Sequence, residues 1–366
     1  MDADPGVGGG GGSSGSGSGS AGDPGGGAGS GSSGSDPGGG GGTGAPGQTI
    51  TANSVTLDLP PRLQWEANFG YCGELSFIIA GLHFGQYLSQ YDARALATPG
   101  IKQSSSSSQL LLDANEDVAA KAMKLDYEIW PKTGNSDAFV LWTKKHLLAN
   151  HPIVLGVFEN TSIFGFTAEQ GDDYDHIVPL VGYASSHPIT DEQVYDDDQL
   201  TMNDNGDLDQ SVSTSPLTFT YAKSSFVFDR THQPNQPYYI NNGEDSAIAI
   251  LGVNDPDHET FPVQLALNTT SEQPELVDGA STRPAASPVT LTITVSQLTP
   301  GTAYTLYKYT SFTSVPAGNF NANAANAASA TPITISSGTT FTTTETIMSN
   351  EMAIYRAVKA SGSGTN

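Results

Sequence analysis

The sequence has few basic residues, one cysteine and no long apolar run. Its 366 residues include 14 Lys and Arg against 38 Asp and Glu, which gives a formal net charge of −24 at pH 7. Nucleic acids and anionic membranes bind clusters of basic side chains, so this charge argues against both as partners. No apolar stretch approaches the roughly 18 residues of a membrane-spanning helix, and we expect no membrane span.

The lone cysteine, Cys72, excludes a disulfide framework within the chain, so disulfides give no information about the cellular compartment. The start Met1-Asp2-Ala3-Asp4 lacks the basic and apolar regions of a secretory signal. Two glycosylation sequons, at Asn160 and Asn268, are compatible with secretion of a soluble protein. Localisation and oligomeric state are left open by these features.

Residues 1–48 lack aromatic side chains and consist almost entirely of Gly, Ser, Asp, Ala and Pro. Such a segment has too little apolar surface to offset the entropy lost on ordering, and we expect a disordered tail there and at 361–366. The length between these tails suggests two domains, since domains commonly have about 100–200 residues. The composition changes after Asp255-Pro256, which predicts domains at 49–256 and 257–360.

Hydrophobic periodicity divides the first domain into helices and strands. A strand is expected near residues 50–59, a long helix over 73–95 and a second helix from Ser136 to Leu148. Buried strands are expected at 153–158 and 176–183.

The second domain is rich in Thr, Ser, Ala and Pro, and residues 289–295 alternate between polar and apolar side chains. With further strand candidates at 304–309 and 354–358, this pattern predicts an antiparallel β-sandwich. The run Leu298-Thr-Pro-Gly-Thr-Ala-Tyr304 resembles a corner of fibronectin type III domains, in which the tyrosine hydroxyl bonds back to the backbone.

Cys72 lies in Asn68-Phe-Gly-Tyr-Cys-Gly-Glu-Leu-Ser76, where a loop gives way to the predicted helix. Free N–H groups and the positive end of the helix dipole at such a position favour a thiolate. A nucleophilic thiolate also needs a histidine and a polar side chain that orients the imidazole. His176 begins a predicted buried strand, and Asp204 and Asn205 follow a later strand candidate, so these residues complete a candidate site.

The order of these parts resembles the papain-like cysteine peptidase superfamily, and is most similar to its bacteriocin-leader-processing branch. The chain does not contain the papain signature Cys-Gly-Ser-Cys-Trp. The resemblance extends over about Leu59–Val253 and consists of four short segments: Tyr71-Cys-Gly73, Ala149-Asn-His-Pro-Ile-Val154, Asp175-His-Ile-Val178 with Val181-Gly-Tyr183, and Thr201-Met-Asn-Asp-Asn-Gly206.

The resemblance implies an α+β, papain-like fold, with Cys72 as nucleophile and His176 as general base and acid. It implies Asp204 as the orienting residue, with Asn205 as the alternative if the alignment shifts by one position. The family usually has an oxyanion-hole glutamine six residues before the cysteine, where this chain has Glu66. A carboxylate cannot donate a hydrogen bond to an oxyanion, so the nearby carboxamides of Gln64 and Asn68 are the candidate donors.

The other histidines show no metal-ligand spacing with Cys72, and Asp204-Asn-Gly-Asp-Leu-Asp209 does not fit the EF-hand pattern, although an irregular calcium site stays an alternative. We therefore expect no metal and no cofactor. The first hypothesis is a cysteine peptidase or amidase that cleaves a peptide or isopeptide bond in a protein or peptide substrate. The alternative is an inactive protein that serves as an acidic binding or structural protein through its sandwich, and Glu66 is the feature that favours it.

Overall fold

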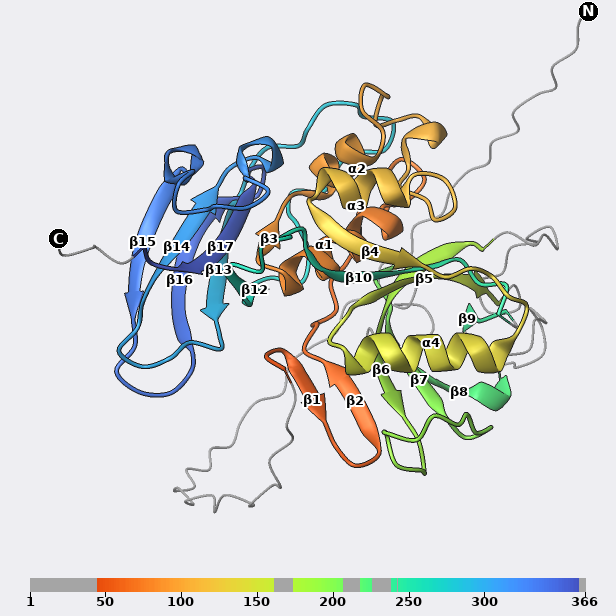
Figure 1. The fold of residues 1–366 in the computed structure, drawn as a ribbon. Coiled ribbons are helices and arrows are strands. Elements are labelled where there is room, and N and C mark those ends of the chain that lie inside the picture. Colours follow the sequence, from red (N-terminus) through yellow and green to blue (C-terminus); the bar gives the residue numbers. More distant parts are fainter. Residues whose placement is uncertain (1–44, 161–173, 207–217, 226–237, 242, 362–366) are drawn as a thin grey trace, which may run out of the picture. The chain divides into compact units, whose positions relative to one another are not determined.

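The computed structural model describes residues 45–160, 174–206, 218–225, 238–241 and 243–361 (Figure 1). These residues belong to one compact unit that spans Gly42–Asn366. Most of the two expected tails, residues 1–44 and 362–366, lies outside the described residues, and the first strand already begins at Gln48. Asn160 of the first sequon is fully buried and donates a hydrogen bond to the hydroxyl of Tyr239.

The centre of the first part is a sheet in which nine strands pair within the described ranges. The main path runs β1-β2-β6-β5-β10-β4, with β7 and β8 added beside β6 and β9 added beside β5, and all of these pairs are antiparallel. The two central strands β5 and β6 are almost entirely buried, which explains their nearly continuous apolar sequences. The bounds are β1 Gln48–Ile50, β2 Ser54–Leu57, β4 Leu125–Ile129, β5 Ile153–Glu159, β6 His176–Ala184, β7 Gln199–Asn203, β8 Thr218–Ala222, β9 Tyr238–Tyr239 and β10 Ala247–Val253.

Helices flank this sheet, and α4 lies across one of its faces (Figure 1). The Asn135 side chain caps α4 by accepting the N–H groups of Asp137 and Ala138, as expected for a short polar residue at a helix start. The helix predicted over 73–95 is instead two helices, because Gly85, at φ +72°, turns the chain between them. The helices are α1 Cys72–His83, α2 Gln90–Ala97, α3 Glu116–Ala122 and α4 Ser136–Leu148.

The C-terminal part contains a five-stranded and a three-stranded antiparallel sheet within the described residues. Burial alternates along β13, and the hydroxyl of Tyr304 accepts the backbone N–H of Thr299 at 2.8 Å, which confirms the predicted corner. The predicted boundary near residue 256 falls between β10 and β11, yet β3 of the first part pairs with β17. The strands are β3 Gln86–Tyr87, β11 Thr260–Phe261, β14 Ala303–Tyr309, β15 Ser329–Thr334 and β17 Ala353–Lys359 in one sheet, and β12 Val263–Leu267, β13 Pro288–Val295 and β16 Phe341–Met348 in the other.

The expectation of an α+β, papain-like fold class is wrong. Among the described residues, strands hold 34% and helices 19%, with four α-helices against several sheets. The physical reason lies in the segments after α1. The expected long helix is interrupted, and short alternating segments pair into extra strands around the central β5 and β6.

Within the described ranges, no helix combines the length and the apolar character needed to cross a membrane.

Candidate functional site

The N-terminus of α1 holds the candidate nucleophile. Cys72 is the first residue of the helix and is half-buried. Its backbone N–H belongs to the first turn, where N–H groups have no partner within the helix. Gly73 follows because the chain passes too close for a side chain: a Cβ there would lie 2.0 Å from the carbonyl oxygen of Leu110. The Cys-Gly pair therefore reflects a close backbone approach next to the thiol.

The ends of two neighbouring strands hold the other two candidate residues. His176 is the first residue of β6, as the sequence predicts, and Asp204 follows the last residue of β7. Because β6 and β7 pair, these two side chains lie together, with His176 Nε2 3.2 Å from Asp204 Oδ1. Both are buried, at 3% and 1% exposure, so their hydrogen bond is shielded from water.

Asp204 is held by three groups. Its Oδ1 also accepts the backbone N–H of Gly206 at 2.9 Å, and its Oδ2 accepts the hydroxyl of Tyr238 at 3.0 Å. The Tyr238 ring also stacks on the ring of His176, with centroids 5.5 Å apart. The sequence alone gives Tyr238 no role, because it lies in a short apolar stretch without a motif. It fixes both partners of the His176–Asp204 pair.

The charge state of His176 follows from its neighbours. Burial disfavours the imidazolium, but the hydrogen bond with Asp204 and the adjacent Cys72 side chain outweigh it and raise the pKa of His176 to about 10. Because Asp204 binds Nε2, Nδ1 is the ring nitrogen left for the thiol. A protonated imidazole beside a thiol favours the nucleophilic thiolate.

Asn205, the alternative to Asp204 as the orienting residue, binds other groups than the imidazole of His176. Its Nδ2 donates to the carbonyl oxygens of Cys72 and Ile177, at 3.0 and 3.1 Å, and to Ser76 Oγ at 2.9 Å. Cys72 begins α1 and Ile177 follows His176, so one carboxamide joins the two backbones that carry the thiol and the imidazole. Asn205 fixes their spacing, while Asp204 makes the contact with the ring.

The two candidate oxyanion-hole donors differ in their surroundings. Gln64 is buried, and its backbone N–H donates to the carbonyl of Asn205 at 2.7 Å. The side-chain Nε2 of Gln64 donates to Glu66 Oε1 at 3.1 Å and lies 3.6 Å from where a Cβ on Gly70 would be. The acceptor, Glu66, is exposed.

Asn68 does not fit the role of a donor. Its Nδ2 donates to the carbonyl of Ala280 at 2.8 Å, and its Oδ1 accepts the N–H of Gly279 at 2.8 Å. Both polar atoms of this carboxamide thus hold the segment around residue 279, which leaves Gln64 as the candidate donor of the two.

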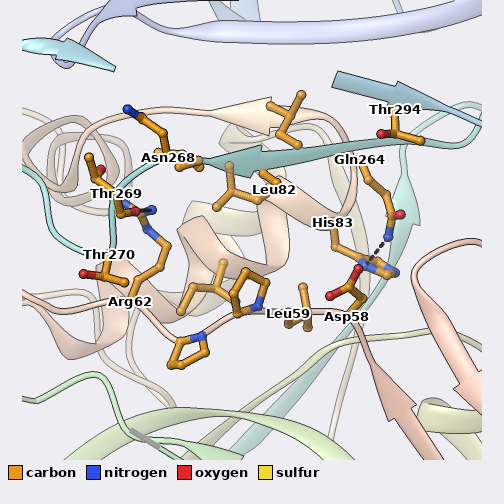
Figure 2. A pocket seen from close by; sticks show the side chains of 16 residues that line it. Asp58, Leu59, Arg62, Leu82, His83, Gln264, Asn268, Thr269, Thr270 and Thr294 are labelled. Carbon is orange, nitrogen blue, oxygen red and sulfur yellow. Dashed lines mark hydrogen bonds between the residues drawn. The ribbon is translucent and has the colours of Figure 1, made fainter. Parts of the chain in front are cut away.

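A cavity of about 220 Å³ lies at the other end of α1 (Figure 2). Four parts of the chain line it: residues 58–62, the C-terminal end of α1, residues 264–270 and Thr294. In Figure 2, His83 faces Gln264 across one side of this cavity, with the hydrogen bond between them drawn as a dashed line. Cys72, His176 and Asp204 are not among the residues that line it. Cys72 and His83 lie at opposite ends of α1, about 16 Å apart along the helix axis. The cavity is therefore separate from the candidate site.

Within the described part of the chain, no group of three or more His, Cys, Asp or Glu side chains is arranged to hold a metal ion. The alternative of an irregular calcium site concerns residues 204–209, of which 207–209 lie outside the described residues. Comparison with protein-family models, with curated proteins and with solved structures gives no match to this chain.

Proposed function

We propose that this protein is a cysteine-type hydrolase that cleaves a peptide or isopeptide bond. One observation carries the proposal: Asp204 binds the buried His176 on Nε2, and the Cys72 side chain lies close enough to raise the pKa of the same imidazole. Cys72, His176 and Asp204, from here on called the triad, then have the roles of nucleophile, acid and base, and orienting group. The motif order that resembles papain-like cysteine peptidases supports the same assignment.

The reaction proceeds in two steps. The Cys72 thiolate attacks the carbonyl carbon, the C–N bond breaks, and His176 gives its proton to the leaving amine. Water then attacks the thioester, His176 takes a proton from that water, and the acid is released as the thiolate re-forms. An amine in place of water would yield acyl transfer by the same residues. Gln64 and the Cys72 N–H are the proposed donors to the oxyanion.

The first experiment measures iodoacetamide labelling of Cys72 against pH by intact mass. Since the chain has a single cysteine, every labelled molecule reports this thiol, and Cys72→Ser is the blank. We expect labelling at pH 6 at a rate close to that at pH 8.5, because protonated His176 stabilises the thiolate, and loss of the pH 6 labelling in His176→Ala. A wild-type profile that follows an ordinary thiol, with a midpoint near about 8.5, would contradict the proposal.

A second measurement tests hydrolysis itself. The protein is incubated with a pooled peptide library, and new peptide ends are identified by mass spectrometry against the Cys72→Ser variant. We expect cleavage products that depend on Cys72. Ordinary thiol reactivity together with the absence of such products would instead favour the second hypothesis, an acidic binding or structural protein.

A further inference from the structure

Three successive residues before α1 have left-handed backbone conformations. The φ angles are +51° at Asn68, +71° at Phe69 and +79° at Gly70. Glycine adopts this region freely and asparagine adopts it fairly often, but a phenylalanine there is strained by about 1–2 kcal/mol. Such a conformation persists only where the surrounding contacts enforce it, and it is common at functional sites.

Hydrogen bonds to each of its three carbonyl groups hold this turn in its left-handed conformation. The buried Arg94 donates to the carbonyl of Asn68 at 2.9 Å and to that of Gly70, and Gln109 donates to the carbonyl of Phe69 at 2.8 Å. Arg94 is fixed in turn by Glu74, with Nε and Oε1 2.5 Å apart. A buried ion pair on the first turn of α1 therefore holds the strained turn next to the nucleophile.

The side chain presented by this turn is apolar and open to solvent. Phe69 is 64% exposed, and among the described large hydrophobic residues only Val277, at 74%, is more exposed. These two residues lie on segments that are hydrogen-bonded to each other. Asn68 precedes Phe69, Asp278 follows Val277, and the Asn68 N–H donates to Asp278 Oδ1 at 2.9 Å. The Asn68 carboxamide also binds the backbone of Ala280 and Gly279. The two most exposed large apolar side chains thus come from joined segments.

We propose that Phe69 and Val277 form an apolar subsite that binds a hydrophobic side chain of the substrate peptide. This inference rests on the proposed function. Phe69 precedes Cys72 by three residues, so their Cα atoms lie at most about 11 Å apart, the length of about three residues of an extended peptide. An apolar contact here would fix the substrate relative to the thiol. The strain at Phe69 is then the cost of exposing a ring at this place.

The test uses tripeptide chloromethyl ketones, which alkylate an active-site thiol and carry side chains that a subsite can bind. The parent probe is acetyl-Ala-Ala-Gly chloromethyl ketone, and each Ala is replaced in turn by Leu or by Asp. The rate of Cys72 alkylation is divided by the iodoacetamide rate of the same variant, so that differences in thiol reactivity cancel. At one position we expect the Leu probe to react about 10-fold or more faster than the Asp probe, as burial of a leucine side chain allows.

Phe69→Ala and Phe69→Asn should each reduce this preference several-fold, and Val277→Ala should reduce it in part. Asparagine tolerates a positive φ, so Phe69→Asn should also keep or raise the melting temperature, which separates binding from folding. Ile101→Ala, at an exposed apolar residue outside these two segments, is the matched control and should retain the preference.

Equal Leu and Asp rates in the wild type, or a Leu preference that survives both Phe69 substitutions, would overturn the inference. Iodoacetamide labelling at pH 6 would still stand in that case. Loss of that labelling in the wild type would instead overturn the proposed function, so the two failures are distinguishable.

Discussion

Among the side chains next to His176, Asp204 raises the pKa of His176 most, chiefly through its hydrogen bond and in smaller part through its charge. Asp204→Asn keeps an oxygen that can accept from Nε2 but removes the negative charge. We predict that the pKa of His176 falls by about 1–3 pH units, the usual effect of one opposite charge at this distance. The measurement is an NMR titration of the His176 Cε1–H signal.

Asp175→Asn serves as the control, because Asp175 is the exposed carboxylate next to His176 in the chain and binds the N–H of Glu159 instead. If both substitutions lowered the pKa of His176 equally, the general acidity of the chain, and not the Asp204 contact, would control it.

Individual residues differ in how far the sequence identifies them. Cys72 and His176 are predictable because each begins an element with a clear apolar pattern. The choice between Asp204 and Asn205 is not, because a shift of one residue at a strand end reverses the direction of the side chain. Tyr238 gives no signal in the sequence, since its hydroxyl contacts a residue 34 positions away. Proximity of that kind is set by strand pairing.

The start of α1 depends on the backbone space beside Gly73. Gly73→Ala places a Cβ against the Leu110 carbonyl, a backbone atom that can move only with its segment. We predict a loss of about 1–3 kcal/mol in the free energy of unfolding, typical of overpacking, and weaker labelling of Cys72 at pH 6. Urea denaturation and iodoacetamide labelling measure the two effects.

Gly81→Ala in the same helix is the matched comparison. The nearest atom to a Cβ there is the mobile Cε of Met123 at 3.1 Å, and alanine favours a helix over glycine by about 1 kcal/mol. This substitution should be close to neutral. A Gly73→Ala variant as stable as Gly81→Ala would show that the approach of Leu110 does not require glycine.

The bounds of an element are predictable where its hydrophobic periodicity is complete. They are poorly predictable where a contact with a distant segment determines where the element ends. The helix from Ser136 and the strands from Ile153 and His176 begin where the sequence predicts. The expected helix over 73–95 breaks at Gly85, whose φ of +72° turns the chain, and a Cβ on this glycine would lie 2.9 Å from the Cβ of Val263. That contact comes from β12, so the local pattern before residue 95 carries no information about it.

Across the whole molecule, His83 links elements from distant parts of the chain. From the end of α1, its Nε2 lies 3.2 Å from the carbonyl of Asn150, after α4. Its Nδ1 lies 3.0 Å from Gln264 Nε2, on β12, and Figure 2 draws this second contact as a dashed line. A carbonyl can only accept and an amide nitrogen can only donate, so the ring is neutral, with its proton on Nε2. The same ring therefore joins the first part to the C-terminal part only while it stays unprotonated.

Acid should weaken this junction. Burial lowers the pKa of His83 from 6.5 to about 4, so the stability that its neutral form contributes is present above pH 6.5 and is lost as the pH falls toward 4. We predict that the wild type loses stability relative to His83→Gln by about 1.4 kcal/mol per pH unit in this range. Urea denaturation at several pH values measures the difference, with the exposed His258→Gln as a variant that should follow the wild type. A difference that does not change between pH 6.5 and 4 would mean that His83 does not control the acid sensitivity of the junction.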